Sequence, residues 1–172
     1  MHDGYYRFPT IHGEKVVFAS ENDLWRVPAN GGVAVRLTAG LGAAGYPRFS
    51  PDGSLIAFSG SYEGPNEVFV MPTQGGQPRR LTFLGNNVLV CGWDPDGKVL
   101  FASAAHSPFG RPSDIFQVSP EGGPPERLPI GPALTVSYGP ERGMVLGRYG
   151  MISREPAHWK RYKGGTAGDM WI

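Results

Sequence analysis

The sequence lacks several features that would point to particular classes of protein. It has one cysteine, Cys91, which cannot close an intrachain disulfide, so we expect a reducing compartment, the cytoplasm. Its first residues show no basic segment followed by an apolar run, which predicts no signal peptide, although a processed secreted protein would look the same. No apolar run reaches the roughly 20 residues that a membrane helix needs, and we expect no membrane partner.

An excess of positive charge is also missing. The 16 basic and 15 acidic side chains give a formal net charge of +1, which argues against a nucleic-acid partner. Long helices are not expected either, because 26 glycines and 17 prolines among 172 residues interrupt nearly every stretch. Since 40% of the residues are hydrophobic, a packed core remains possible, and we expect a β-rich globular chain with many turns.

What the sequence does contain is an internal repeat. The pattern of an acidic, an aliphatic and an aromatic residue occurs four times, at Asp23-Leu24-Trp25, Glu67-Val68-Phe69, Asp114-Ile115-Phe116 and Asp169-Met170-Trp171. The first three copies are followed by a double glycine and then by Arg36-Leu37-Thr38, Arg80-Leu81-Thr82 and Arg127-Leu128-Pro129. The first two aromatic positions are 44 residues apart, which is the period of a β-propeller blade.

Each part of the repeat predicts a piece of a four-stranded meander. Turn sequences such as Ser50-Pro51-Asp52-Gly53 precede short apolar runs, which are typical of buried strands. The double glycine predicts the next hairpin turn, the Arg-Leu-Thr segment predicts the outer strand, and the aromatic residues are expected to stack neighbouring blades. The predicted fold class is therefore all-β, a β-propeller with about three and a half blades, at about 5–39, 45–83, 88–129 and 134–172.

The fourth blade stops in its third strand. Closing a ring with an unfinished blade would leave strand edges and apolar faces in water. We therefore expect the chain to be the N-terminal part of one propeller domain, with the remainder of its own polypeptide as its first partner.

The connections of such a meander sort to two ends of each blade. The predicted turns at one end are short and repetitive, whereas those at the other end are long and irregular: 60–66, 104–113, 150–168, 40–45, 84–87 and 130–134. Variable loops on a rigid scaffold often carry binding, and they are also where neutral insertions are tolerated. Both interpretations stay open.

The longest of these connections is basic. We take as candidate residues for binding a peptide or an acidic partner Arg154, His158, Lys160, Arg161 and Lys163. The alternative is a solvated hairpin whose aromatic residues pack on the blade beneath the basic side chains.

Other motifs do not support chemistry in this chain. Gly40, Gly42 and Gly45 match the spacing of a dinucleotide fingerprint, but a predicted strand follows where that fingerprint needs a helix. The histidines show no metal-ligand spacing, and Cys91 lies in an apolar segment that predicts an inert core thiol. We predict no catalytic residues, no metal site and no cofactor.

The last repeat carries a more specific resemblance. His158-Trp159-Lys160, Tyr162, Gly164-Gly165-Thr166, Gly168 and Trp171-Ile172 resemble the first propeller of the tricorn protease family. Similar resemblances are seen at Ile11-His12-Gly13-Glu14-Lys15 and at Val145-Leu146-Gly147-Arg148, so the likeness covers the whole chain.

This resemblance implies a six-bladed N-terminal propeller in a serine peptidase that degrades short peptides and assembles as a homohexamer. It implies that the nucleophile and its base lie downstream, and that this segment forms a channel or filter. The family's arginine pair at the entry of the third blade is missing from Gly85-Asn86-Asn87-Val88, which puts carboxylate anchoring there in doubt. The alternative is a TolB-like propeller for protein interaction, without catalysis.

Overall fold

The computed structural model describes residues 5–40, 42–62, 64–107, 113–148 and 169–172. These residues form antiparallel β-sheets, with one short 3-10 turn, η1 (Pro140–Arg142), between the paired strands Thr135–Tyr138 and Met144–Arg148. No described segment is a helix of the length and apolar character that a bilayer crossing requires. The all-β prediction is confirmed.

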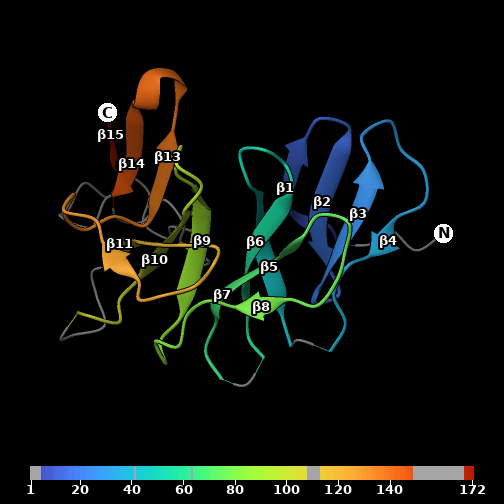
Figure 1. The fold of residues 1–172 in the computed structure, drawn as a ribbon, viewed down its shortest axis with the longest axis horizontal. Helices are drawn as coiled ribbons and strands as arrows, with labels where there is room; N and C mark the ends of the chain where they lie inside the picture. The colour runs from blue at the N-terminus through green and yellow to red at the C-terminus, as the bar shows by residue number, and fades with distance from the viewer. Residues whose placement is uncertain (1–4, 41, 63, 108–112, 149–168) are drawn as a thin grey trace, which may run out of the picture.

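Strands follow one another in chain order within each of four sheets (Figure 1). The first sheet contains β1 (Arg7–His12), β2 (Lys15–Ser20), β3 (Asp23–Pro28) and β4 (Val35–Arg36). The second contains β5 (Ala44–Phe49), β6 (Leu55–Gly60), β7 (Glu67–Pro72) and β8 (Arg79–Arg80). The third contains β9 (Val88–Trp93), β10 (Val99–Ser103), β11 (Asp114–Val118) and β12 (Glu126–Arg127), and the fourth contains β13 (Thr135–Tyr138), β14 (Met144–Arg148) and β15 (Asp169–Trp171).

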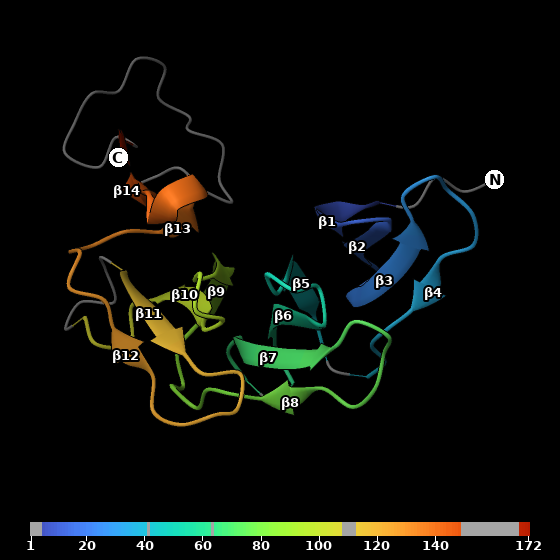
Figure 2. The same cartoon turned by 45° about the horizontal axis from the view of Figure 1, so that its top comes forward.

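The four sheets are arranged as consecutive propeller blades. Figure 2 shows them side by side along an arc, with β4, β8 and β12 on the outside. The first strand of each sheet lies on the inside, where β1 contacts β5, β5 contacts β9 and β9 contacts β13. The outer strands are shorter than the sequence predicts, because each two-residue strand ends at the arginine of the Arg-Leu-Thr segment.

The core consists of three apolar clusters, each lying between neighbouring sheets. Phe58 and Phe69 stack on each other at 5.6 Å between ring centroids and pack in the cluster against the first sheet. Phe101 and Phe116 stack at 5.5 Å in the cluster against the second sheet. The two rings of each pair therefore come from neighbouring strands of one sheet. Both pack against residues of the preceding sheet.

One end of the arc, which we call the turn end, holds the β1–β2, β5–β6, β9–β10 and β13–β14 turns together with the double-glycine turns. Here Asp52 accepts hydrogen bonds from the Ser50 and Ser54 hydroxyls at 2.6 and 2.7 Å, and these bonds lower the pKa of its carboxyl to about 2. Neighbouring turns also touch: Arg142 bonds Asp96 at 2.7 Å in the preceding sheet. The turn end is thus braced within and between blades.

The opposite end, which we call the loop end, holds the β2–β3 type connections and the segments that join one sheet to the next. A main-chain hydrogen bond repeats here between successive sheets. Ala44 N–H donates to Asn22 O at 2.8 Å, Val88 N–H donates to Asn66 O at 3.1 Å, and Ala133 N–H donates to Ser113 O at 3.0 Å. The residue before each β3-type strand thereby holds the start of the next inner strand.

Candidate functional site

The basic residues proposed from the sequence, Arg154, His158, Lys160, Arg161 and Lys163, lie outside the described residues. Their binding role stays a prediction. The described part of the loop end instead presents a feature that the sequence does not reveal, a pair of adjoining cavities.

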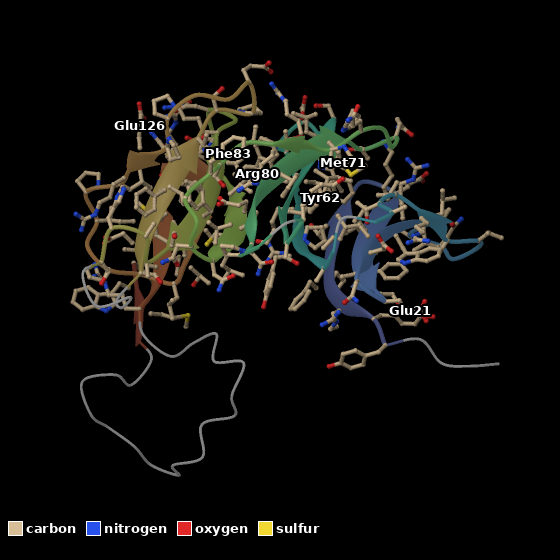
Figure 3. The ribbon with its side chains drawn as sticks, turned by 90° about the horizontal axis from the view of Figure 1, so that it is seen from below. Glu21, Tyr62, Met71, Arg80, Phe83 and Glu126 are labelled. Carbon is tan, nitrogen blue, oxygen red and sulfur yellow. The ribbon has the colours of Figure 1, made fainter. Side chains whose placement is uncertain are left out.

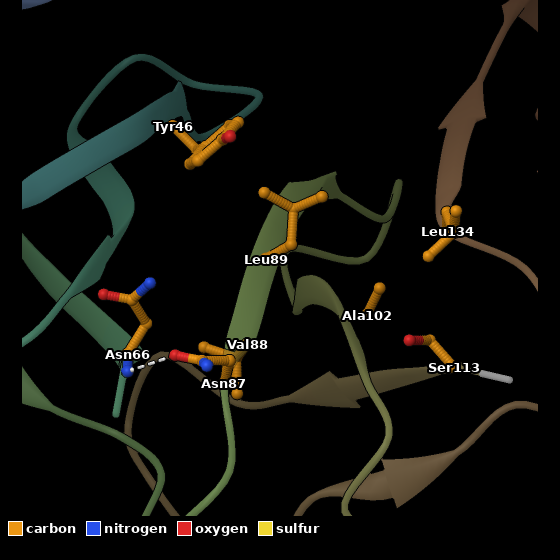
Figure 4. Close-up of a pocket in the computed structure, with 8 residues that line it drawn as sticks. All are labelled: Tyr46, Asn66, Asn87, Val88, Leu89, Ala102, Ser113 and Leu134. Atoms are coloured by element: carbon orange, nitrogen blue, oxygen red, sulfur yellow. Dashed lines mark hydrogen bonds between the residues drawn. The ribbon is translucent and has the colours of Figure 1, made fainter. Parts of the chain in front are cut away.

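We call these two cavities together the loop-end groove. The larger, of about 750 Å³, lies against the first and second sheets and reaches Asn87; the smaller, of about 220 Å³, extends from the second sheet to the third and fourth. Tyr46, Asn66 and Asn87 line both, so the two cavities adjoin; Figure 4 shows the smaller one. The larger volume falls within the ~300–1,000 Å³ range typical of ligand sites.

An aromatic pair with unusual backbone geometry forms one wall of the groove. Phe8 and Tyr46 each precede a proline, each has a positive φ (53° and 54°), and each lies where the strand register shifts. Their rings stack at 3.9 Å between centroids, across the boundary between the first two sheets. A strained backbone of this kind costs about 1–3 kcal/mol per residue and persists only where the surrounding packing fixes it. The register shifts are typical of β-bulges, which redirect a side chain.

Amide side chains supply the polar part of the lining. Asn66 N–H donates to Asn87 Oδ1 at 3.0 Å, which fixes the asparagines where the two cavities meet (Figure 4). The side-chain amides of Asn22 and Asn66 make no hydrogen bond to another described residue. An amide offers both donors and an acceptor, so these groups can bond either kind of polar group on a ligand.

Arg7 is the one charged side chain among the described residues that line the groove. Its guanidinium lies over the rings of Tyr5 and Phe8, at 5.6 and 5.7 Å from their centroids. Its Nε is buried without a hydrogen-bond partner, and no described carboxylate pairs with it. The groove therefore has a positive charge that the described protein leaves uncompensated.

Ion pairs on the outer side of the first three sheets stabilise the loop end. Glu67, only 1% exposed, accepts from Arg80 at 3.1 Å, from the Thr82 hydroxyl at 2.5 Å and from Gly85 N–H at 2.9 Å. Arg80 also packs on the ring of Phe83 (Figure 3). We call this the acid–Arg–Thr clasp.

The same clasp occurs in the first sheet, where Asp23 is bound by Arg36 and Thr38. The third sheet has only half of it: Arg127 bonds Asp114 at 2.9 Å, but the threonine position is Pro129, which has no hydroxyl to donate. In the first two copies, the threonine oxygen also accepts the N–H of the residue after the acid, at 2.9 Å. The clasp thus ties the outer strand to the start of the third strand.

A second arginine on the inner strands has a different role. Arg48 donates to Cys91 O at 3.0 Å, while its own carbonyl accepts from the Trp93 indole at 2.9 Å, so it joins the second and third sheets. Burial lowers the pKa of Arg48 and raises the pKa of the Cys91 thiol to about 11. Such a thiol is a poor nucleophile at neutral pH, in agreement with the inert core thiol predicted from the sequence.

The chemistry that this arrangement supports is binding. Among the described residues, no three histidine, cysteine, aspartate or glutamate side chains gather as metal ligands would. Gly42 and Ala43 lead directly into β5, which contains Gly45, so a strand follows these glycines as predicted from the sequence. The Asp94 carboxylate bonds the N–H groups of Asp96 and Lys98 in its turn, at 2.9 and 2.7 Å.

Two features of the site escaped the sequence interpretation although signals for them exist. The clasp is signalled by a constant separation of 13 residues between the acid and the arginine in all three copies. The stacked pair is signalled by two aromatic-proline dipeptides, Phe8-Pro9 and Tyr46-Pro47, ahead of equivalent strands. The charge of Arg7 has no signal, because only the fold shows that it lacks a partner.

Comparison with known proteins agrees with this architecture. The chain is 42% identical to Tricorn protease homolog 1 of Streptomyces coelicolor over 169 residues, which is 98% of the chain and 16% of that protein. It is 32% identical to a putative Tricorn-like protease N-terminal subunit of Sulfurisphaera tokodaii, covering 86% of that protein. The chain thus spans about a sixth of the first relative and most of the second.

Solved structures point the same way. The crystal structure of the tricorn protease superposes with a TM-score of 0.82 at 28% identity, over 96% of this chain and 17% of that one. A putative TolB from Agrobacterium tumefaciens shares the fold at a TM-score of 0.69, with 24% identity over 84% of this chain and 54% of that one. The family described as the tricorn protease N-terminal beta propeller domain matches residues 3–172. Over almost its whole length, therefore, the chain belongs to the tricorn protease N-terminal β-propeller family.

Proposed function

We propose that this chain forms part of the wall of a propeller channel in a tricorn-like serine peptidase that degrades short peptides. The match of residues 3–172 to the tricorn propeller family carries the proposal. The arrangement of the inner strands side by side supports it, because rigid, bonded strands form a wall that excludes folded proteins but lets an extended chain pass. The chemistry, acyl transfer through an activated serine, belongs to domains beyond this segment.

Several parts of the proposal follow from the resemblance and not from the geometry. These are a six-bladed ring completed by the rest of the polypeptide and a homohexamer. Two other parts come from the sequence itself: a cytoplasmic location from the single cysteine and the missing signal segment, and peptide contacts from the charge of the basic residues of 154–163. The TolB-like alternative, a propeller for protein interaction, rests on likeness of fold alone at 24% identity.

The channel role can be tested by obstructing the loop end in the full-length protein. Tyr62 is 54% exposed, lies between two residues that line the groove, and lines neither cavity itself. A Tyr62→Cys variant, with other accessible cysteines replaced, can be coupled to a polymer through a maleimide. Cys91 should not interfere, because burial raises its thiol pKa to about 11.

We expect coupling at position 62 to slow the hydrolysis of a fluorogenic short peptide severalfold. The matched control is Gln77→Cys, an exposed position in the double-glycine turn of the same sheet, where coupling should leave the rate unchanged. Equal rates for both coupled proteins would refute the channel role of this propeller. Failure of the uncoupled full-length protein to hydrolyse short peptides at all would refute the peptidase assignment.

A further inference from the structure

The double-glycine turns of the second and third sheets each contact an arginine of the preceding sheet. Arg26 of the first sheet donates to the main-chain oxygen of Thr73 at 2.7 Å and to Gln74 Oε1 at 2.9 Å, in the turn of the second sheet. Arg79 of the second sheet donates to two main-chain oxygens in the turn of the third sheet, of which Glu121 O is at 3.0 Å. The contact repeats although the two arginines come from different strands, β3 and β8.

Equivalent positions accept the arginine in both turns. They are the two residues that precede the glycines, and a main-chain oxygen accepts in each turn. The side chain next to the first glycine adds a further oxygen: the amide of Gln74, and the carboxylate of Glu121, which lies 3.7 Å from Arg79. A guanidinium presents five N–H donors in a planar fork, so it can bond several oxygens at once. Each turn is thus an acceptor site for an arginine of the neighbouring blade.

The turn of the first sheet has the same geometry but no described arginine. Gly31 N–H donates to Pro28 O at 2.9 Å, and the corresponding bonds of the other two turns measure 3.0 and 2.9 Å. Ala29 and Asn30 hold the two acceptor positions, and both are exposed. Neither the Ala29 oxygen nor the Asn30 side chain bonds another described residue. At an end that is otherwise braced by pairs, this turn is the exception.

The flank of the first sheet that faces away from the second sheet is also uncovered. Figure 2 shows this sheet at one end of the arc. Val17 packs in the cluster with the second sheet, so Phe18 and Trp25 lie on the opposite face, where both are only half-buried. Tyr6 contacts Phe18 edge-on at 5.1 Å between centroids and is 67% exposed, and Ile11 is 64% exposed. In the next two sheets, the equivalent flank is buried against the preceding sheet.

The chemistry of the first turn favours a guanidinium as its partner. Its acceptors are a carbonyl and a side-chain amide oxygen, and the charged residues that pair with the turn, Glu14 and Lys15, are opposite in sign. Hydrogen-bonding geometry therefore determines the partner more than net charge does. A lysine ammonium is a compact point charge and does not offer the planar fork that spans neighbouring oxygens.

We propose that the Ala29 oxygen and the Asn30 side chain bind an arginine of the last blade of the same propeller, and that this blade covers the Phe18–Trp25 flank. In a closed ring, the sheet that precedes the first one is the last blade. The chain covers only 16% of its Streptomyces coelicolor relative, so later parts of the polypeptide can supply that blade. The inference rests on the proposed function, in which the rest of the polypeptide completes the ring.

Photo-crosslinking in the full-length protein identifies the surface that faces the first turn. Benzoylphenylalanine is placed at position 30, and the cross-linked peptides are identified by mass spectrometry. We expect links to an arginine-containing segment of the last blade. Position 74 is the positive control, because Gln74 contacts Arg26 and should link to β3. Position 35 is the matched control: Val35 pairs with Arg26 on the flank toward the second sheet and should give no link to the last blade.

Substitutions at position 30 test the charge of the partner. Asn30→Asp adds a carboxylate, as Glu121 has beside Arg79, whereas Asn30→Arg brings two guanidinium groups together. We expect hydrogen exchange of the first sheet to be about tenfold slower in Asn30→Asp than in Asn30→Arg, which is the size of one charge-assisted contact. Replacing the cross-linked arginine by glutamine should abolish this difference. At Val33, which is 85% exposed, the same two changes should give nearly equal exchange.

The inference is overturned if position 30 links to a second copy of the chain, to the second sheet or to nothing while position 74 links to β3. Equal exchange in Asn30→Asp and Asn30→Arg also overturns it. In each case, continued hydrolysis of short peptides and its block at position 62 leave the channel proposal standing. Loss of that hydrolysis in the unmodified protein instead overturns the channel proposal, so the two failures are distinguishable.

Discussion

The two ends of the propeller arc use the same kinds of residues for different purposes. At the turn end, polar side chains are paired: Asp52 bonds two hydroxyls, and Arg142 bonds Asp96 across a blade boundary. At the loop end, Arg7 and the amides of Asn22 and Asn66 line a cavity without partners among the described residues. Paired groups stabilise a fold, whereas preorganised unpaired groups remain available to a ligand.

The acid–Arg–Thr clasps keep the loop end rigid although its groove is lined by unpaired groups. The acid–Arg–Thr clasps lie at the loop end but away from the groove, so the loop end is rigid on its outer side and open on its inner side. Clasp strength also varies, since Glu67 is buried with three partners whereas Asp114 has only Arg127. Substitutions at each end should therefore have effects of different size.

The largest effect is expected for Glu67→Ala. This change leaves Arg80 without its carboxylate and removes the acceptor for Thr82 and Gly85 N–H, all in a site where Glu67 is 1% exposed. We expect the second sheet to lose about 3–5 kcal/mol. Hydrogen exchange of β7 and β8 in the full-length protein measures the loss locally.

Asp114→Ala is the matched control for this substitution. Its partner Arg127 is half exposed and Pro129 replaces the threonine, so we expect a loss of about 1 kcal/mol in the third sheet. Equal losses in the two sheets would show that the threonine and main-chain contacts of the clasp contribute nothing.

An intermediate effect is expected for Gly53→Ala at the turn end. Gly53 has φ +70°, and an added Cβ would lie 2.2 Å from the His12 ring of the preceding sheet. We expect a loss of about 2–4 kcal/mol, from backbone strain and overpacking together. At the loop end, Gly64→Ala has open space around the new methyl group, so only strain remains, about 1–2 kcal/mol.

A double substitution separates the two contributions. Adding His12→Ala to Gly53→Ala should recover the overpacking part, and thermal unfolding measures the coupling. If the two substitutions prove additive, contact between the turns is not what braces that end.

The smallest effect concerns acid pH and Asp52. Its pKa is about 2 in the folded protein against an ordinary 3.8, so its charged form stabilises the fold above pH 3.8, and that contribution is lost as pH falls through about 2. Asp52→Asn lacks the charge at every pH. The difference in melting temperature between wild type and variant should shrink over this interval, and a constant difference would contradict the assignment.

The repeat predicts most of the fold because the strands of one blade follow one another directly in the sequence. Turn sequences, apolar runs and the double glycine lie within one blade, and each encodes its own strand or turn. The outer strand of the first sheet ends before Leu37 and Thr38, because the Leu24 N–H donates to the Thr38 hydroxyl oxygen and not to a main-chain carbonyl.

The groove could not be predicted, because it depends on contacts between blades. Tyr46 and Asn87 are far apart in the sequence and meet only when the sheets pack side by side. Whether Arg7 has a partner likewise depends on which side chains the fold brings near it, and the sequence does not show this. The sequence did indicate that the irregular loops share one end, and the groove lies there, but its polar lining comes from strand ends as well as loops.

The repeated main-chain bond between successive sheets has a consequence for how this surface can change. Asn22, Asn66 and Ser113 hold the next blade through carbonyl oxygens, which every amino acid possesses. These three contacts between successive sheets therefore do not require a particular side chain. Substitutions at Asn66 and Ser113 can therefore change the lining of the groove while this contact is kept, whereas Asn22, at φ +69°, has a backbone that favours asparagine or glycine.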